Sequence, residues 1–273
     1  MRPLRVLTLN IWNRSGPWEH RLAVLRKELR ELDPDLVALQ EVLSPEGLPL
    51  PGQHAQIAEG LGYHTAFGSS AALGGIAYGN AVLSRWPIAR SETLPLEGTP
   101  KAGDFGCSLL ATEIAAPCGA IPFFVTHLVW RLHEGAIRRR QVAAVAEHVA
   151  RLAPVSRVEA FPAILAGDFN AEPDSDEMRF LRGLTAIDGR TVYFADCHAV
   201  AGEGRGVTFS KRNVYAADSR EPERRLDYVY VRGPDRKGRG QPLGARVCFD
   251  REVEGAFASD HFGVLARIRV DED

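Results

Sequence analysis

Residues 163–173 read Ala-Ile-Leu-Ala-Gly-Asp-Phe-Asn-Ala-Glu-Pro, an apolar stretch that runs into Gly-Asp-Phe-Asn and a proline. The apolar part predicts a buried strand at 163–166, and the Gly and Pro residues predict a turn after it. An ordinary turn is one interpretation, since Gly, Asp, Asn and Pro are common turn residues. In the other, Asp168 and Asn170 lie two apart on an extended segment and point to one target. The carboxylate could then take a proton from water while the amide donates to an anionic oxygen.

The same arrangement, a polar residue at the end of an apolar strand, recurs along the chain. Strands are predicted at 5–10, 36–42, 63–67, 77–84, 108–114, 121–126, 163–166, 226–231 and 263–270. The polar residues at or just past their ends are Asn10, Glu41, His127, Asp168, Asn170, Asp227, Asp260 and His261. Strand ends in α/β sheets are where a rigid scaffold meets an open crevice, so these residues can converge on one site.

Two helices accompany the strands. Leu22, Leu25, Leu29 and Leu32 recur at three- and four-residue steps, which places one leucine stripe against a core. A second helix is predicted over 134–152. Strands alternate with helices early in the chain and become a meander later, which predicts an α/β domain with mixed sheets. No change of composition marks a boundary, so we predict one domain over residues 1–273.

Two acids sit inside otherwise apolar strands and need partners. Burying an unpaired carboxylate costs several kcal/mol. Asp227, in LDYVYV, has two candidate partners, Arg225 and His261. Glu41, which follows LVALQ, must be paired, hydrogen-bonded or bound to a metal, and for one acid alone a salt bridge is the commoner outcome. Carboxylate and amide oxygens without paired cysteines favour Mg²⁺ or Mn²⁺ over zinc.

The histidines and the segment 78–80 each allow two interpretations. An imidazole such as His261 is a natural donor to a developing negative oxygen, provided that a carboxylate fixes its tautomer. His127, at the end of FFVTHL, could equally be a hydrogen-bonded core residue. Tyr78-Gly79-Asn80 could be a plain turn, or a place where backbone and amide approach a phosphate.

The amino-acid composition excludes only a few classes of protein. The 273 residues carry a formal net charge of −2, so no overall positive field indicates nucleic acid or an anionic membrane. The four cysteines are scattered, which disfavours a zinc cluster or a disulfide framework. We see no transmembrane segment, no secretory leader and no sign of an obligate protein partner, and we therefore expect a cytoplasmic protein.

In order along the chain, these segments resemble the endonuclease/exonuclease/phosphatase superfamily, whose best-known member is pancreatic deoxyribonuclease. The matching segments, which span positions 7 to 267, are LTLNIWN, LVALQEV, GNAVLSRWPI, VTHL followed by RRRQV, LAGDFNAEP, RLDYVYVR and ASDHFGVLARI. No single segment is specific, but their joint order is. The resemblance implies a four-layer α/β/β/α sandwich of two mixed sheets flanked by helices. It also implies a metal-dependent phosphoester hydrolase, most simply a phosphodiesterase.

The resemblance further implies roles at the matching positions. Glu41 is similar to the principal Mg²⁺ ligand, or Mn²⁺ ligand, of the family, with Asn10 and Asp260 as further metal-site residues. The catalytic set implied is Asp168, Asn170, His261, Asp227 and His127, in which Asp168 orients or deprotonates the attacking water and Asp227 polarises His261. Asn80, Tyr78 and Arg225 are the predicted substrate contacts. One departure is that no acid near 78–80 matches the one that supports a histidine in deoxyribonuclease, so Asn80 or Asp260 could serve instead.

The substrate class stays open between nucleic acid, a lipid head group and a small molecule. A nuclease acting on DNA or RNA would use the basic residues at 211–225 and 138–140, although these could simply be a solvated surface. A sphingomyelinase-like or inositol-phosphate-directed enzyme would want an apolar entry surface, for which the candidates are Trp12, Trp18, Trp86 and Trp130. A catalytically silent phosphate-binding scaffold is the third alternative, disfavoured because no principal site residue is missing.

Overall fold

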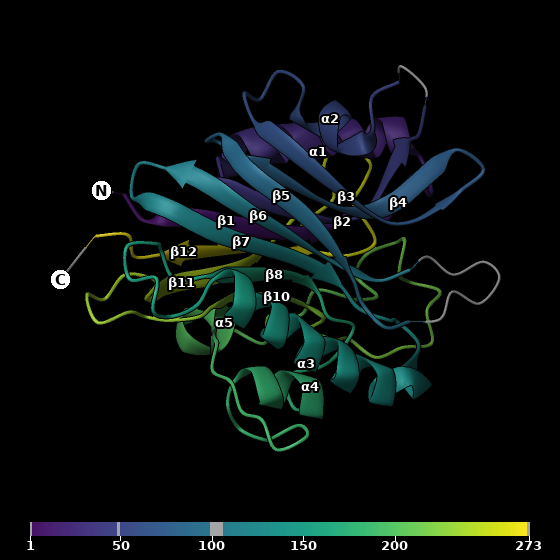
Figure 1. Ribbon diagram of the computed structural model, residues 1–273. Helices are drawn as coiled ribbons and strands as arrows, with labels where there is room; N and C mark the ends of the chain where they lie inside the picture. The colour runs from purple at the N-terminus through teal and green to yellow at the C-terminus, as the bar shows by residue number, and fades with distance from the viewer. Residues whose placement is uncertain (1, 48–49, 99–105, 272–273) are drawn as a thin grey trace.

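The computed structural model describes residues 2–47, 50–98 and 106–271 and shows two β-sheets packed face to face with helices on their outer faces (Figure 1). The predicted α/β/β/α sandwich of two mixed sheets is therefore confirmed. The predicted single domain, 1–273, also includes residues 1, 48–49, 99–105 and 272–273, which lie outside the described residues.

The first sheet has six strands in the order β11-β12-β1-β2-β4-β3. Their bounds are β1 Leu4–Asn10, β2 Leu36–Pro45, β3 His64–Leu73, β4 Ile76–Ser84, β11 Pro242–Cys248 and β12 Gly263–Ile268. Strands β1 and β2 are parallel, and β12 runs antiparallel to β1. The ends of β1 and β2 therefore lie together at one edge of the sandwich.

The second sheet also has six strands, in the order β5-β6-β7-β8-β10-β9. Their bounds are β5 Ile88–Pro95, β6 Ser108–Ala116, β7 Gly119–His127, β8 Ile164–Asp168, β9 Ala195–Asp196 and β10 Asp227–Val231. Strands β7 and β8 are parallel, with His127 opposite Asp168. Strand β10 is antiparallel to β8 and places Asp227 opposite Asp168 on the other side. Sheet register alone thus brings three predicted site residues side by side.

The helices cover both outer faces (Figure 1). Their bounds are α1 Trp18–Leu32, α2 Gln53–Ala58, the 3₁₀ turn η1 Leu132–Glu134, α3 Gly135–Leu152, α4 Asp176–Leu181 and α5 Cys197–Ala201. The two predicted helices are α1 and α3. After the early alternation of strands and helices, β5, β6 and β7 form an antiparallel meander, and α3 follows it.

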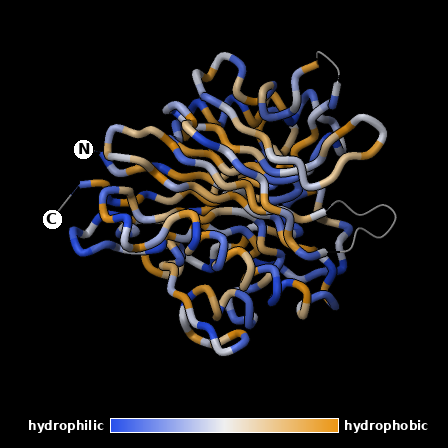
Figure 2. The backbone as a smooth tube through the Cα atoms, in the orientation of Figure 1, coloured by the Kyte–Doolittle hydropathy of each residue, from blue (hydrophilic) through white to orange (hydrophobic). Residues whose placement is uncertain are grey.

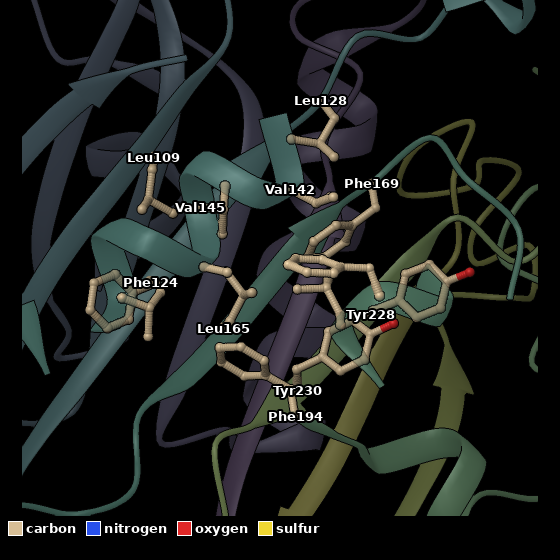
Figure 3. Packing of buried hydrophobic residues seen from close by; sticks show 14 of the residues in the cluster. Leu109, Phe124, Leu128, Val142, Val145, Leu165, Phe169, Phe194, Tyr228 and Tyr230 are labelled. Atoms are coloured by element: carbon tan, nitrogen blue, oxygen red, sulfur yellow. The ribbon is translucent and has the colours of Figure 1, made fainter. Parts of the chain in front are cut away.

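Three apolar cores follow from this layering, and Figure 2 shows the sheet strands as the hydrophobic centre of the molecule. One core lies between the two sheets, one beneath α1 and α2, and one between the second sheet and α3 and α4. In the last of these, shown in Figure 3, Phe169, Tyr228 and Tyr230 pack ring against ring. These rings flank Asp168 and Asp227 in the sequence, so the core fixes the strands that carry both acids.

Strands β5, β9 and β11 and the short helices were not predicted. Strand β5 has an exposed, polar outer face, and β11 is an edge strand with partial burial, so neither shows a continuous apolar run. None of the helices formed by the described residues is long and apolar enough to cross a membrane.

Candidate active site

The candidate site lies where the ends of β1, β2, β7 and β8 meet the start of β10. Asp168, which is buried, is at its centre. Its Oδ1 accepts from the backbone N–H of Asn170 at 2.9 Å, and its Oδ2 accepts from Nδ2 of Asn10 at 3.0 Å. The same Oδ2 lies 3.6 Å from Nε2 of His127 and 3.8 Å from Nε2 of His261. One carboxylate therefore joins residues from both sheets.

A β-bulge brings Glu41 to the site. The pairing of β2 with β4 shifts register between Leu39 and Val42, and Glu41 has φ +59°, in the left-handed region. Val37, Leu39 and Val42 all pack in the core beneath α1, so in a regular strand Glu41 would take the place that Val42 occupies. Bulges commonly redirect a side chain in this way. The strained, left-handed backbone conformation of Glu41 thus directs its carboxylate toward Asp168.

Two asparagines hold Glu41. Nδ2 of Asn10 donates to Oε1 at 3.1 Å, and Nδ2 of Asn13 donates to Oε2 at 2.9 Å. Oδ1 of Asn10 accepts from the backbone N–H of Trp12 at 2.9 Å, so the nitrogen of Asn10 faces the two carboxylates. In this arrangement Asn10 orients Glu41 and Asp168, whereas the sequence resemblance implied a metal ligand. Asn13 had no predicted role, although it lies in the segment LTLNIWN.

His261 forms a pair with Asp227, which decides between the two partners that the sequence allowed for this acid. Nδ1 of His261 lies 3.0 Å from Oδ2 of Asp227, and both side chains are buried. Burial opposes a charge on the imidazole, but the negative charges of Asp227 and Asp168 outweigh it and raise the pKa of His261 well above its usual value. A protonated His261 directs Nε2–H toward Asp168 and the space beside it. The pair is therefore built to present a proton.

Arg225, by contrast, is not brought into the site. Its guanidinium is buried, donates to Asp196, and lies over the ring of Tyr228. Because this internal ion pair occupies its charge, the prediction of Arg225 as a substrate contact lacks structural support.

His127 is held from both sides. Nδ2 of Asn170 lies 3.1 Å from its Nε2, and the hydroxyl of Tyr78 lies 3.4 Å from its Nδ1. Asn170 has φ +50° and also donates to the carbonyl of Leu128 at 3.1 Å. Tyr78 therefore stands at the position where the sequence suggested that Asn80 or Asp260 would support a histidine.

Asn80 forms a hydrogen bond that links the two sheets. It is buried, and its Nδ2 donates to the carbonyl of Ser108 at 3.1 Å. This contact joins β4 to β6 across the sandwich. The structure thus shows Asn80 in a contact between the two sheets, and its role as a substrate contact stays a prediction.

Asp260 completes the acidic side of the site. Burial raises its pKa to about 6, the negative charge of Glu41 adds to the shift, and the charges of His261 and Arg21 oppose it. Oγ of Ser259 donates to its Oδ1 at 3.2 Å. Glu41 and Asp260 are thus two carboxylates close enough to repel each other.

Two sets of residues could hold a cation. Asp168, Asp227 and His261 offer ligand atoms within 4.8 Å of one another, but Nδ1 of His261 is already engaged by Asp227. Oδ1 of Asp227 is buried and has no hydrogen-bond partner among the described residues. Glu41 and Asp260 provide carboxylate oxygens, which is the donor chemistry that Mg²⁺ and Mn²⁺ prefer. The Glu41 and Asp260 pair fits such an ion better.

Arg21 supports the site and was missed from the sequence. It lies on α1 with no exposed surface and donates to the carbonyls of Ile11, Trp12, Asn13, Ser15 and Ala258. Burial lowers its pKa to about 10. A signal was present, because Arg21 shares the buried face of the helix with Trp18 and Leu25 at three- and four-residue steps.

Replacing Arg21 with Met is expected to destabilise the protein by ~3 kcal/mol or more, because each buried carbonyl left unsatisfied costs about 1–3 kcal/mol. Five carbonyls would lose a donor, and the loop that carries Asn13 would lose its anchor. Urea unfolding followed by circular dichroism measures the change. Arg30→Met, on the exposed side of the same helix, is the matched control and should shift stability by less than about 0.5 kcal/mol. Equal unfolding midpoints for the two variants would contradict this role.

The comparisons with known proteins agree with this geometry. A family model described as "Endonuclease/Exonuclease/phosphatase family" matches residues 7–261. The uncharacterized protein YbhP of Escherichia coli (strain K12) is 31% identical over 178 residues, which cover 61% of this chain and 66% of YbhP. The chain thus matches slightly less than two thirds of the length of that relative.

Two solved structures show the same fold. The endonuclease/exonuclease/phosphatase from Beutenbergia cavernae DSM 12333 superposes with a TM-score of 0.73 at 26% identity, covering 98% of this chain and 72% of the other. D. rerio TDP2, complexed with a single-strand DNA product, has a TM-score of 0.76 at 19% identity and covers 97% and 98%. Every residue of the candidate site, from Asn10 to His261, lies within residues 7–261, the span that the family model matches.

Proposed function

Because the chain belongs to the endonuclease/exonuclease/phosphatase family, we propose that it is a divalent-metal-dependent phosphodiesterase that acts by in-line attack of water. The observation that carries the proposal is the position of Asp168, whose Oδ2 lies between Asn10, His127 and His261. These residues come from four separate strands or loops. Such convergence of a carboxylate, an amide and two imidazoles is what phosphoryl transfer needs for positioning.

In the proposed mechanism Asp168 binds the attacking water. The hydrogen bonds from Asn10 and from the backbone of Asn170 hold its carboxylate in one orientation. An oriented carboxylate can align the water with the phosphorus and accept a proton from it. We therefore assign Asp168 the role of aligning the attacking water and accepting its proton.

His261 is assigned to the charge that develops on the phosphate. Asp227 fixes the ring through Nδ1 and keeps it protonated, so that Nε2–H is free to donate to a phosphate oxygen. Donors that are already in place when charge develops stabilise the transition state without reorganisation. Asp227 thus acts through His261 as a positioning residue.

Asn170 and His127 are assigned to binding the phosphate. Nδ2 of Asn170 lies 3.1 Å from Nε2 of His127, and this Nε2 lies 3.6 Å from Oδ2 of Asp168. A divalent cation held by Glu41 and Asp260, which we propose to be Mg²⁺ or Mn²⁺, would supply positive charge to the non-bridging phosphate oxygens. Asn10 and Asn13 would keep the carboxylate of Glu41 aimed at that ion.

The ion pairs formed by the basic residues indicate which class of substrate the protein binds. Arg138 is paired with Glu177, Arg140 with Glu97, and Arg224 with Glu221, so much of the positive charge that a nucleic-acid backbone would use is neutralised within the protein. We therefore propose a strand end or a small diester as the substrate rather than a long duplex. Trp130, 57% exposed and three residues after His127, could contact either a nucleobase or an apolar group.

A panel of substrates tests the proposal. Bis-p-nitrophenyl phosphate, single-stranded DNA, plasmid DNA, RNA and sphingomyelin would each be offered with Mg²⁺ and with Mn²⁺. We expect turnover of the first two to exceed that of plasmid DNA. Absence of turnover across the whole panel would overturn the proposal and favour the phosphate-binding scaffold.

A further inference from the structure

A second hollow lies at the opposite end of the strands that carry the site. Strands β8 and β10 are paired from Ile164 with Val231 to Asp168 with Asp227. The hollow begins just outside the first pair, at Ala163 and Arg232. At ~3.3 Å per residue, the strands separate it from Asp168 by about 13 Å or more. It shares no residue with the candidate active site.

Two loops enclose the hollow, one between α3 and β8 and the other between β10 and β11. Its volume is about 650 Å³, within the usual range for sites that bind small molecules. The apolar part of its wall is formed by Pro122, Pro154, Val155, Val158, Phe161 and Pro162. Val155 and Val158 are 74% and 69% exposed, so apolar surface faces the opening.

The charged part of the wall is strongly cationic. One carboxylate, Asp235, lines the hollow together with the cations Arg157, Arg232, Arg236, Lys237 and Arg239. Arg239 donates to Asp235 at 2.7 Å, and Arg157 donates to Glu113 at 2.5 Å. These two arginines therefore already form ion pairs within the protein. Arg232 and Arg236 have no such ion pair with an acid among the described residues.

Arg232 is the notable member of this group. It is half-buried, and Nη1 donates to the carbonyl of Ala153 at 3.2 Å. Across the described parts of the chain, no carboxylate forms an ion pair with it, and burial lowers its pKa without an acid to compensate. A second hollow of about 720 Å³ also borders Arg232, together with Val155 and Pro234. Arg232 therefore borders two open volumes and has no carboxylate partner within the described residues.

We propose that this hollow binds an organic anion that carries a phosphate or carboxylate group on an apolar body. The planar fork of Arg232 matches the two oxygens of either head group, and Arg236, which is exposed and likewise unpaired in the described structure, adds charge. The proline and valine wall would cover the apolar body. The bound anion would offset the cost of a half-buried guanidinium that no acid of the protein neutralises.

Isothermal titration calorimetry on protein freed of divalent metal by prior dialysis tests the proposal with three probes. Phenylphosphonate and benzoate share an apolar body and differ in the head group, whereas methylphosphonate keeps the phosphonate and lacks the body. We expect saturable binding of phenylphosphonate or benzoate, the tighter of the two identifying the preferred head group. Methylphosphonate should bind about tenfold more weakly, as expected when most apolar contact is lost.

Variants separate this site from other cationic surfaces. Arg232→Gln should weaken binding of the preferred probe about tenfold, and Arg236→Gln, at an exposed residue where folding is not at risk, about threefold. Arg246→Gln, the same charge change on the exposed surface of β11, and Asp168→Asn, in the active site, should leave the affinity unchanged. Failure of the probes to saturate into the millimolar range would overturn the proposal. So would equal affinities for the wild type, Arg232→Gln and Arg236→Gln, or loss of binding in Asp168→Asn.

Discussion

Asp168→Ala is expected to lower kcat for phosphodiester hydrolysis by about 10²–10³-fold while the fold is retained, by analogy with deletion of one preorganised catalytic group. The carboxylate is the shared partner of Asn10 and Asn170, and two imidazoles lie within 4 Å of it. Its loss would leave the attacking water without an acceptor. Steady-state kinetics with bis-p-nitrophenyl phosphate measures the effect.

The same reasoning extends to His261→Ala and Asn170→Ala, each of which should also remove most activity. Residues that act as a unit are not additive, so Asp168→Ala/His261→Ala should be little slower than the slower single variant. Asp174→Ala, an exposed carboxylate beyond the turn after β8, is the matched control and should retain normal turnover. Near-normal turnover in two of the variants at Asp168, Asn170, His261 and Glu41 would refute the site assignment.

Removal of divalent metal is expected to abolish hydrolysis, and Mg²⁺ or Mn²⁺ is expected to restore it. The site contains two carboxylates, Glu41 and Asp260, and the charge of Glu41 contributes to the raised pKa of Asp260. A cation would neutralise that repulsion and supply charge to the phosphate. Activity assays after exhaustive chelation, followed by titration with each metal, measure the dependence.

Glu41→Gln should raise the metal concentration needed for half-maximal activity by about tenfold or more, because one formal charge at the ion is lost. Calorimetric titration of Mg²⁺ into the inactive Asp168→Asn background gives a readout that does not depend on turnover. Glu92→Gln, at an exposed position on β5, removes a carboxylate elsewhere and should leave metal dependence unchanged. Full activity in protein stripped of metal would contradict this assignment.

The strands and the polar residues at their ends could be predicted from the sequence, because both depend on local pattern. Apolar runs such as LVALQ and AILAG must be buried, and an acid directly after such a run must find a partner. The order of the segments around Asp168 and His261 also indicated the sandwich. For these reasons the fold class and the main members of the site were accessible before any contact was known.

Which partner each polar residue takes was decided by the tertiary structure alone. Asn10 contacts Asp168 across 158 positions of sequence, and Asp227 pairs with His261 while Arg225, two residues away from Asp227, turns to Asp196. The bulge that turns Glu41 into the site depends on the register of β2 against β4, which local pattern does not encode. Sequence fixes which side chains need a partner, since burial follows from local hydrophobicity. Only packing of the two sheets brings distant groups within hydrogen-bond distance, and that step selects one partner from several of suitable charge.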